Sequence, residues 1–343
     1  MTDANLFAQQ ESNRRRSAVL VAIFVLFFAW IGFGADLILY LQTSGAPPGH
    51  YHHVIPFCGI AATLLALGMA RAGWKSGAKH VLWATGAWEL VTPSTPEEKQ
   101  LDNIVEEMAI ASGLPKPKIW IVPDDDPNAF ATGTDERHAH IAVTQGLLKT
   151  LDRDELQAVI AHEMAHIRNY DVKLMTLLAA LVGVLAIVSQ GASRMIGFGG
   201  SSRSRSSSVS REESKNGGLI VVLLVAWIVS VLLAPLVSRL LALAVSRKRE
   251  YLADASAAQF TRNPGALADA LQKIESAAAP TKALQKAGSA HLCIADPMGR
   301  KVTSREGRLA DLLATHPPMA TRIARLRAMA YQYGKTGVMP ESV

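Results

Sequence analysis

Cysteine is almost absent from this chain of 343 residues, which contains only Cys58 and Cys293. Neither has a partner at the spacing of metal ligands, and two distant cysteines do not make a disulfide framework. The sequence therefore excludes a small disulfide-stabilised fold, and the scarcity of cysteine suits a reducing compartment.

Charge is scarce as well. Charged residues make up 19% of the chain and hydrophobic residues 49%, an apolar composition for a soluble protein. The formal net charge of +6 at pH 7 is modest. Because a charge of this size does not by itself indicate nucleic-acid binding, we expect no nucleic-acid partner and turn to the apolar residues.

Polar interruptions are missing from four long apolar runs, at residues 18–41, 54–70, 174–190 and 219–237. A helix needs about 17–25 such residues to cross the ~30 Å hydrocarbon core of a bilayer. A buried core helix of that length would still show a polar stripe, and here only Asp36 interrupts the pattern. The sequence predicts four transmembrane helices. The first is too long for a cleaved signal peptide and is predicted to be an anchor.

Lys and Arg residues near the ends of these runs predict the orientation of the chain. Twelve lie at one set of ends: Arg14, Arg15, Arg16, Arg71, Lys75, Lys79, Arg168, Lys173, Arg239, Arg247, Lys248 and Arg249. At the opposite ends, residues 42–53 contain none and residues 191–218 contain five. Because cytoplasmic loops are enriched in Lys and Arg, both termini are predicted to face the cytoplasm.

The polar blocks between the runs predict the domain organisation. Residues 1–72 form an N-terminal helix pair, while residues 73–171 and 246–343 lie on one side of the membrane and build one domain. Residues 172–245 are a second helix hairpin inserted into that domain. Its Ser/Arg/Gly-rich loop at 191–218 is predicted to be a disordered linker, with a lipid-headgroup patch as the alternative.

The polar blocks are predicted to be mainly α-helical with a small antiparallel β-sheet. The segments KIWIV (118–122), NAFAT (128–132) and HAHIAVT (138–144) alternate or run apolar between turn residues, as strands do. Helices are predicted at Leu101–Ala111 with Gly113 as the stop, after the capping pair Asp152 and Glu155, from Pro264, and after Pro317 and Pro318.

The segment IAHEMAHIRNYD (160–171) places two histidines four residues apart. On a helix, His162 and His166 lie on one face, one turn apart, where both can bind one tetrahedral ion at about 2.0–2.1 Å. Apolar residues such as Ile160 and Met164 form a buried face that points away from them. The imidazoles are therefore predicted to project into a cleft.

Glu163 directly follows the first histidine, where its carboxylate reaches a metal-bound water rather than the metal itself. Zinc lowers the pKa of such a water toward about 7, and the carboxylate accepts its proton as the water attacks an amide carbon. The pattern His-Glu-x-x-His is the signature of zinc metallopeptidases. The alternative interpretation is an exposed helix that happens to carry two histidines.

A catalytic zinc site needs a third protein ligand. Glu250, in RKREYLADA, follows the fourth apolar run on the same predicted side of the membrane, and Asp254 lies one turn later on the same helix face. Glu250 can complete the ligand set, and Asp254 can accept the Nδ1–H of a ligand histidine. The alternative is an ordinary solvated helix face.

These motifs, in this order, resemble the HtpX-type membrane zinc metalloproteases, which are relatives of the CAAX prenyl proteases. The resemblance covers nearly the whole chain. It is carried by NAFATG at 128–133, HEMAH at 162–166, EYLAD at 250–254 and HPPMATRIARL at 316–326, together with the paired apolar runs. It implies a zincin-like cytoplasmic protease domain on an integral membrane protein.

The resemblance also implies roles for single residues. His162, His166 and Glu250 would bind one zinc ion per chain, Glu163 would be the catalytic base, and Asp254 would orient a ligand histidine. His316 and Arg322 would stabilise the oxyanion, as amide hydrolysis requires. The sequence alone leaves a helix-capping histidine as the alternative for His316.

The implied biology is a multi-pass protease of the bacterial inner membrane that cleaves misfolded or damaged membrane proteins on the cytoplasmic face, in stress response and quality control. Its partners would be these substrates, the lipid bilayer, and a second copy of itself or other quality-control proteases. Asn128, Ala129, Phe130 and Ala131 would form an edge strand to which a substrate peptide adds. Core packing is the alternative for Phe130.

Two other functions compete with this one. An intramembrane protease would hold the metal helix within the bilayer, but Arg153, Asp154, Glu155, Arg168 and Asp171 are too many charges for such a span. A zinc-stabilised scaffold without catalysis would use four protein ligands and leave no open position. Three ligands beside Glu163 argue against a scaffold.

Overall fold

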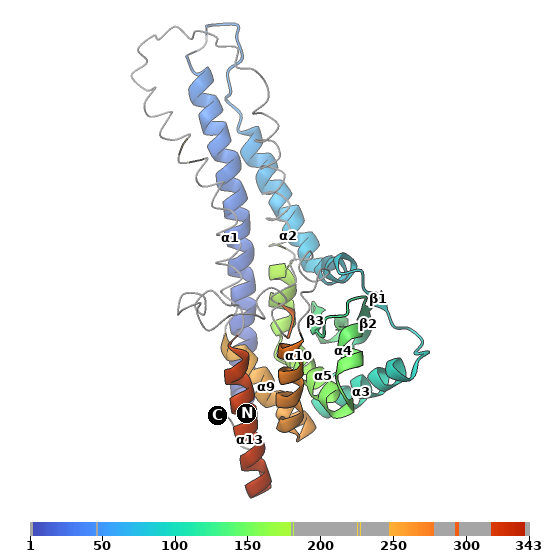
Figure 1. The fold of residues 1–343 in the computed structure, drawn as a ribbon. Helices are drawn as coiled ribbons and strands as arrows, with labels where there is room; N and C mark the ends of the chain where they lie inside the picture. Colours follow the sequence, from blue (N-terminus) through green and yellow to red (C-terminus); the bar gives the residue numbers. More distant parts are fainter. Residues whose placement is uncertain are drawn as a thin grey trace. The chain divides into compact units, whose positions relative to one another are not determined.

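The computed structural model describes residues 3–45, 47–179, 181, 225, 227, 247–277, 292–294 and 317–339. Its helices and strands are labelled in Figure 1. They are α1 (Asp3–Thr43), α2 (Phe57–Ala84), β1 (Trp88–Glu89), α3 (Pro96–Ser112), β2 (Lys118–Val122), β3 (Ala129–Gly133), the 3₁₀ turn η1 (Glu136–His138), β4 (Ala139–Thr144), α4 (Gln145–Thr150), α5 (Arg153–Arg168), α9 (Arg247–Thr261), α10 (Pro264–Ser276) and α13 (Met319–Thr336).

The chain divides into two compact units. The first, which we call the α/β unit, contains Met1–Ser17, Gly73–Ala180 and Ala242–Val343. The second, the helical unit, contains Ala18–Ala72 and Leu181–Leu241. The start of α1 and the end of α2 therefore belong to the α/β unit, as do the sheet and the helices that follow it.

Among the described residues, two helices are long and apolar enough to cross a membrane, Arg15–Thr43 and Phe57–Ala84. Only 22% of the residues in the most apolar window of each are buried within the protein, as expected for surfaces that face lipid. The predicted run at 219–237 lies outside the described residues apart from 225 and 227. Of the run at 174–190, residues 174–179 and 181 are described and helical.

Asp36, the one charge in the first apolar run, is buried and fully engaged within the helical unit. Its carboxylate accepts hydrogen bonds from the backbone N–H groups of Cys58 (3.1 Å) and Gly59 (2.6 Å) in the first turn of α2 and lies 2.8 Å from His53 Nε2. The first turn of a helix has unpaired N–H groups that favour an anion. Asp36 therefore caps α2 and joins the two helices.

The sheet has the strand order β1-β2-β4-β3 and is mixed, so the prediction of an antiparallel sheet is wrong. β2 and β4 run parallel, with Ile119 opposite Ile141, whereas β3 pairs antiparallel with β4 and β1 with β2. The reason is the connection after β2. This connection carries the chain past the position of β4 to the sheet edge opposite β1, where it forms β3. The turn around η1 then brings the chain back as β4, between β2 and β3. The three predicted strands lie within one residue of β2, β3 and β4, whereas the short edge strand β1 was not predicted.

Two predicted helix starts and stops are confirmed by their caps. The α5 N-terminus is a capping box in which Asp152 accepts from the Glu155 backbone and Glu155 accepts from the Asp152 backbone. Gly113 ends α3 in the left-handed conformation, at φ 72°. The start of α3 was predicted too late, because Thr95 and Pro96 begin the helix one turn before its first buried residue.

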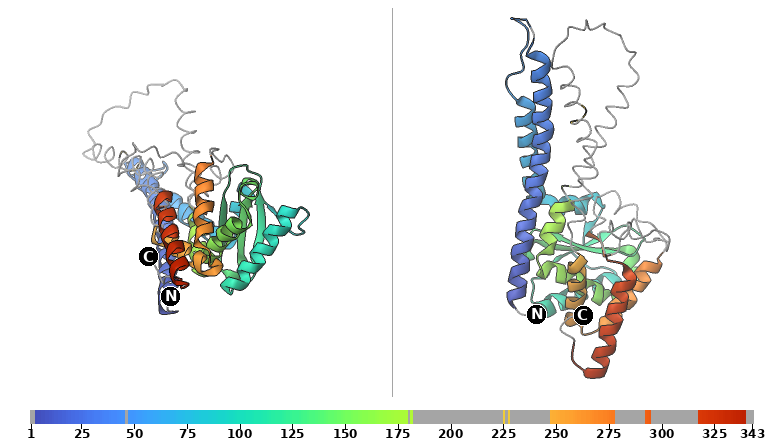
Figure 2. Two further views of the ribbon diagram at one scale, coloured as in Figure 1. Left: turned by 60° about the horizontal axis from the view of Figure 1, so that its bottom comes forward. Right: turned by 90° about the vertical axis from the view of Figure 1, so that its left-hand side faces the viewer.

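α5 lies at the centre of the α/β unit. It packs against α3, α9 and α10 and against β3 of the sheet (Figure 2). The predicted buried face is confirmed, since Leu156, Ile160, Met164 and Ile167 are all buried. The opposite face is buried too, beneath α9. The histidines therefore point toward another helix rather than into an open cleft.

α9, α10 and α13 cover this second face. α10 begins at Pro264, as predicted, with Asn263 as its cap, and α13 follows Pro318. α13 packs on α10 and α9 through Arg322, Leu326 and Met329, which are spaced three and four residues apart and are its buried residues. This arrangement carries side chains of α9 and α13 to the histidine face of α5.

Candidate metal centre

His162 and His166 from α5 and Glu250 from α9 bring one ligand atom each to a single point. His162 Nε2 and His166 Nε2 are 3.2 Å apart. Glu250 lies 3.8 Å from His162 Nε2 through Oε2 and 3.7 Å from His166 Nε2 through Oε1. The structure thus unites two segments that are more than eighty residues apart in the sequence.

These spacings fit a zinc ion. Tetrahedral coordination with bonds of about 2.0–2.1 Å places ligand atoms about 3.3–3.4 Å apart, close to the three distances found here. Two imidazoles and one carboxylate are the ligand set of many catalytic zinc sites, which keep one position open. His162 and Glu250 are buried and His166 is nearly so. The residues present therefore fit the metal that the sequence predicts.

Glu163 lies next to these ligands on α5 and is 1% exposed. Neither of its carboxylate oxygens has a hydrogen-bond partner of normal geometry among the described residues, although the backbone amide of Ala131 on β3 is close by. Burial raises the pKa of Glu163 to about 7, and the Glu250 carboxylate adds to the rise. A buried carboxyl group of this kind is poised to exchange a proton near neutral pH.

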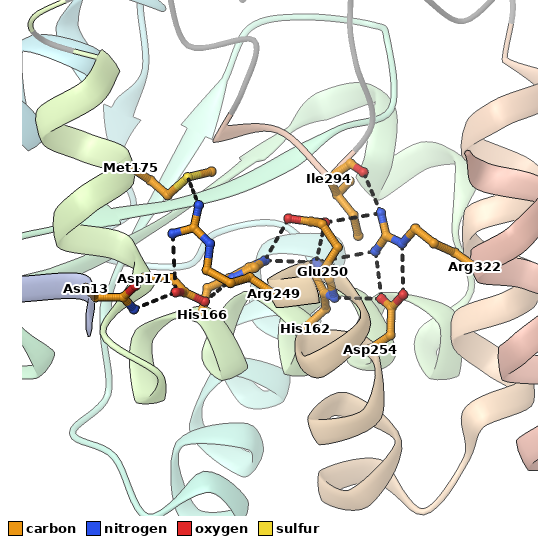
Figure 3. Close-up of polar contacts among 10 residues, drawn as sticks. All are labelled: Asn13, His162, His166, Asp171, Met175, Arg249, Glu250, Asp254, Ile294 and Arg322. Atoms are coloured by element: carbon orange, nitrogen blue, oxygen red, sulfur yellow. Dashed lines mark hydrogen bonds and ion pairs between the residues drawn. The ribbon is translucent and has the colours of Figure 1, made fainter. Parts of the chain in front are cut away.

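Asp254 contacts the His162 ring at Nδ1, the nitrogen that does not face the metal, as Figure 3 shows. This nitrogen lies 3.0 Å from Asp254 Oδ1, outside normal hydrogen-bond geometry. Arg322 binds the same carboxylate with two nitrogens, at 2.9 Å and 2.7 Å. Burial alone would raise the pKa of Asp254, but Arg322 and His162 outweigh it and the pKa is lowered. The Asp254–Arg322 pair is therefore fixed in position, and both groups remain charged.

His166 is held by Asp171, on the other side of the histidine pair in Figure 3. Its Nδ1–H donates to Asp171 Oδ2 at 3.2 Å. Burial alone would lower the pKa of His166, but Asp171 and Glu250 outweigh it and raise the pKa to about 9. Sequence reasoning used Asp171 only as a charge that argues against an intramembrane site. Asp171 lies just past the end of the helix, where helical periodicity gives no signal for its position.

Arg322 is fully buried at the same centre. Besides Asp254, its Nη1 donates to the Ile294 carbonyl at 3.1 Å and lies 3.4 Å from Glu250 Oε2. Its Nη2 also lies 3.5 Å from His162 Nε2, so its donors are directed at the ligands and at the protein groups around them. The second residue predicted at the oxyanion, His316, lies outside the described residues.

The predicted substrate strand is at the sheet edge, as β3, next to α5. Asn128 immediately precedes it, and Phe130 is fully buried, as core packing requires. Two outward-facing backbone groups of β3 already have partners, since Ala129 O accepts from Ile294 N at 3.0 Å and Gly133 N donates to Thr176 Oγ1 at 3.0 Å. Ala131, beside Glu163, lies between these two positions.

The sequence of this chain is similar to those of known proteins. Residues 95–330 match Peptidase family M48. A protein named Protease HtpX homolog from Lactobacillus helveticus (strain DPC 4571) is 36% identical over 324 residues, which are 94% of this chain and 100% of that protein. Another of that name, from Thermoanaerobacter pseudethanolicus (strain ATCC 33223 / 39E), is 37% identical over 334 residues, 96% of this chain and 99% of that protein.

A protein of the same name from Tropheryma whipplei (strain Twist) is 40% identical over 270 residues, 79% of this chain and 85% of that protein. Among solved structures, the crystal structure of S. mikatae Ste24p aligns with a TM-score of 0.43 and 19% identity, covering 90% of this chain and 66% of that one. The family match and the identity along nearly the full chain lead to one conclusion: this chain belongs to peptidase family M48, among its HtpX-type proteases.

Proposed function

We propose that the protein is a membrane-anchored zinc endopeptidase that hydrolyses peptide bonds with Glu163 as the general base. The observation that carries the proposal is the convergence of His162, His166 and Glu250 next to a buried carboxylate without a hydrogen-bond partner of normal geometry. When bound, zinc supplies Lewis acidity, which acidifies water and polarises a carbonyl group.

The residues of the chain have distinct tasks in this proposal. Glu163, with its pKa raised to about 7, takes a proton from the attacking water and passes it to the leaving amine. Asp254 holds the ring of His162 so that Nε2 faces the metal. Arg322 holds Asp254 and Glu250 rather than the substrate, since its nitrogens are directed at these groups. His316 remains our candidate for stabilising the oxyanion.

The outward edge of β3 binds the substrate main chain in this proposal. A peptide that pairs with Ala131 lies beside Glu163, and one that extends to Ala129 replaces the hydrogen bond from Ile294. Main-chain pairing is largely independent of side-chain sequence. This suits a protease that acts on many misfolded or damaged proteins.

The proposed setting is the bacterial inner membrane, with the metal centre and both termini in the cytoplasm and membrane proteins as substrates. The two membrane-length helices and the bacterial relatives named HtpX support a membrane location. The excess of Lys and Arg at one set of span ends supports the orientation. A role in protein quality control and stress response, with itself or other membrane proteases as partners, completes the proposal.

The test is casein digestion by the purified full-length protein in detergent, with and without a zinc chelator. We expect the chelator to abolish cleavage and zinc to restore it. Glu163→Gln should retain zinc and lower the rate about 10²–10⁴-fold, the usual worth of a general base. Glu107→Gln is the control, because Glu107 pairs with Arg153 at the other end of α5. Cleavage that survives Glu163→Gln would remove Glu163 from the mechanism, and a metal-scaffold function would be indicated if the wild type binds zinc without cleaving.

A further inference from the structure

Asn13 is a buried side chain near the start of α1 that contacts Asp171, the residue that supports His166. It is 4% exposed and lies in the α/β unit. Its Nδ2 donates to Asp171 Oδ1 at 2.9 Å and to the Asn169 carbonyl at 3.2 Å. Because both neighbours are acceptors, the orientation of the amide is determined.

The two acceptors flank the turn that follows the metal helix. α5 ends at Arg168, Asn169 is its C-cap, and residues 171–179 begin the next helix. Between the two acceptors, Tyr170 has φ 58°, a left-handed backbone conformation that residues other than glycine rarely adopt. Such conformations persist only where the surroundings hold them. Asn13 binds the turn on both sides of Tyr170.

Asp171 divides its two oxygens between the turn and the ligand. Oδ2 accepts from His166 Nδ1 at 3.2 Å, and Oδ1 accepts from Asn13 and lies 3.4 Å from Arg249 Nη1. A carboxylate turns about a single bond, so fixing one oxygen fixes the direction of the other. Asn13 is the closer of the two donors to Oδ1, as Figure 3 shows together with the chain of contacts.

We propose that Asn13 is a positioning residue of the metal centre, which acts through Asp171 to hold the ring of His166 with Nε2 toward the metal. This inference rests on the proposed zinc site. It adds the first turns of α1 to the parts of the chain that complete that site. Since α1 continues without a break into the span Arg15–Thr43, the helix that carries the first membrane anchor also holds a metal ligand in place.

A purely structural role for Asn13 makes a different prediction. Filling the same buried space with leucine would then preserve zinc affinity and change only the unfolding temperature. A positioning role requires that zinc affinity and the coordination geometry change as well. Ser17 provides a matched control, because it is buried one turn later on α1 and, among the described residues, its hydroxyl bonds to the Asn13 carbonyl of its own helix alone.

The experiment uses the full-length protein in detergent and measures the zinc dissociation constant by competition with a chromophoric chelator, the visible spectrum of the cobalt-substituted protein, and the unfolding temperature. We expect Asn13→Leu to weaken zinc binding about threefold to tenfold, less than the ~10–100-fold typical when a direct partner of a ligand is removed. The cobalt spectrum should shift. Ser17→Ala should leave both properties unchanged.

A reciprocal exchange keeps the test valid if Asn13→Leu does not fold. In the double variant Asn13→Asp/Asp171→Asn, the amide at 171 can accept from His166 and donate to the carboxylate at 13. It should bind zinc more tightly than Asp171→Asn alone. Wild-type affinity and spectrum in Asn13→Leu, or an exchange no better than the single variant, would overturn the inference. A wild-type protein that binds no zinc would instead overturn the proposed function.

Discussion

The two histidines of the metal centre are the same chemical group, yet the protein holds them in opposite electrostatic surroundings. Behind His162, the Asp254 carboxylate is bound by two nitrogens of a guanidinium group. Behind His166, the Asp171 carboxylate accepts from a neutral amide at 2.9 Å and, at the longer distance of 3.4 Å, from Arg249. The pKa of His162 is lowered, mainly by burial, whereas the pKa of His166 is raised to about 9.

This difference separates two tasks that a supporting carboxylate performs. On the His162 side, Arg322 offsets the charge of Asp254, so the carboxylate orients the ring and adds little net field. On the His166 side, the negative charge of Asp171 is less offset, so it raises the pKa of His166 and stabilises a proton on the ring in the metal-free protein. One ligand is thus ready to bind metal near neutral pH, and the other must first release a proton.

The largest effect should come from removing the cation on the His162 side. Arg322→Met leaves Asp254 buried without a counter-charge and removes a partner of Glu250. We expect the free energy of unfolding to fall by about 3–5 kcal/mol, the usual cost of breaking a buried ion pair. A denaturant titration in detergent, monitored by tryptophan fluorescence, measures the free energy of unfolding.

The matched control on the same helix is Arg327→Met, whose ion pair with Asp269 at 3.8 Å is exposed on both sides. It should change the unfolding free energy by less than about 1 kcal/mol. Equal effects of the two variants would show that the Arg322–Asp254 pair is not the buried support described here.

The next largest effect should come from the two supporting carboxylates. Asp254→Asn and Asp171→Asn each replace the acceptor behind one ligand histidine and should weaken zinc binding about 10–100-fold. Because both rings bind the same ion, the double variant should weaken zinc binding more than either single variant, with the two losses coupled. Competition with a chelator measures the zinc affinity of the two single variants and the double variant. Unchanged affinity in Asp171→Asn alone would leave His166 without the support assigned to it.

The pH dependence of zinc binding should report the His166 side. A histidine pKa raised to about 9 means that His166 carries a proton in the metal-free protein at neutral pH and must lose it to bind zinc. Apparent affinity should therefore rise with pH, by about tenfold per unit between pH 6 and 8 if one proton leaves. Asp171→Asn removes a cause of the raised pKa and should flatten this slope. An identical slope in the variant would contradict the comparison.

The smallest effect should come from Arg249→Met. Arg249 is buried beside Asp171, but its Nη1 is 3.4 Å from the carboxylate and its Nη2 contacts the Met175 sulfur at 3.7 Å. Because Asn13 holds the same oxygen at 2.9 Å, zinc affinity should fall only about twofold to threefold, below the range for a direct partner. A loss larger than that of Asn13→Leu would make Arg249 the main support of Asp171.

The sequence predicted correctly the features that depend on hydrogen bonds between residues close together in the chain. The capping box at Asp152 and the stop at Gly113 follow from hydrogen bonds within a few residues, and the structure has both. The pairing of β2 with β4 depends on where a connection takes the chain, which residue patterns do not encode, and it was predicted wrongly. The burial of the histidine face likewise depends on α9 and α13, which come much later in the chain.

The same dependence on distant parts of the chain explains why the carboxylate that supports His162 was predicted and the supports of His166 were not. Glu250 and Asp254 are one turn apart, a spacing that can be read from the sequence as one helix face, and the structure brings both to the histidines. Asp171 lies beyond the helix end, where no periodicity places it. Asn13 contacts Asp171 from more than 150 residues away. Contacts of that kind become visible only in three dimensions.

The central claim is that His162, His166 and Glu250 bind one zinc ion, and the most direct test is the zinc content of the purified protein after equilibrium dialysis against limiting zinc. The wild type should hold about one ion per chain, and Glu250→Ala, which removes one of three protein ligands, should hold a small fraction of that. Equal zinc in the two proteins would contradict the claim, since Glu250 would then not be a ligand.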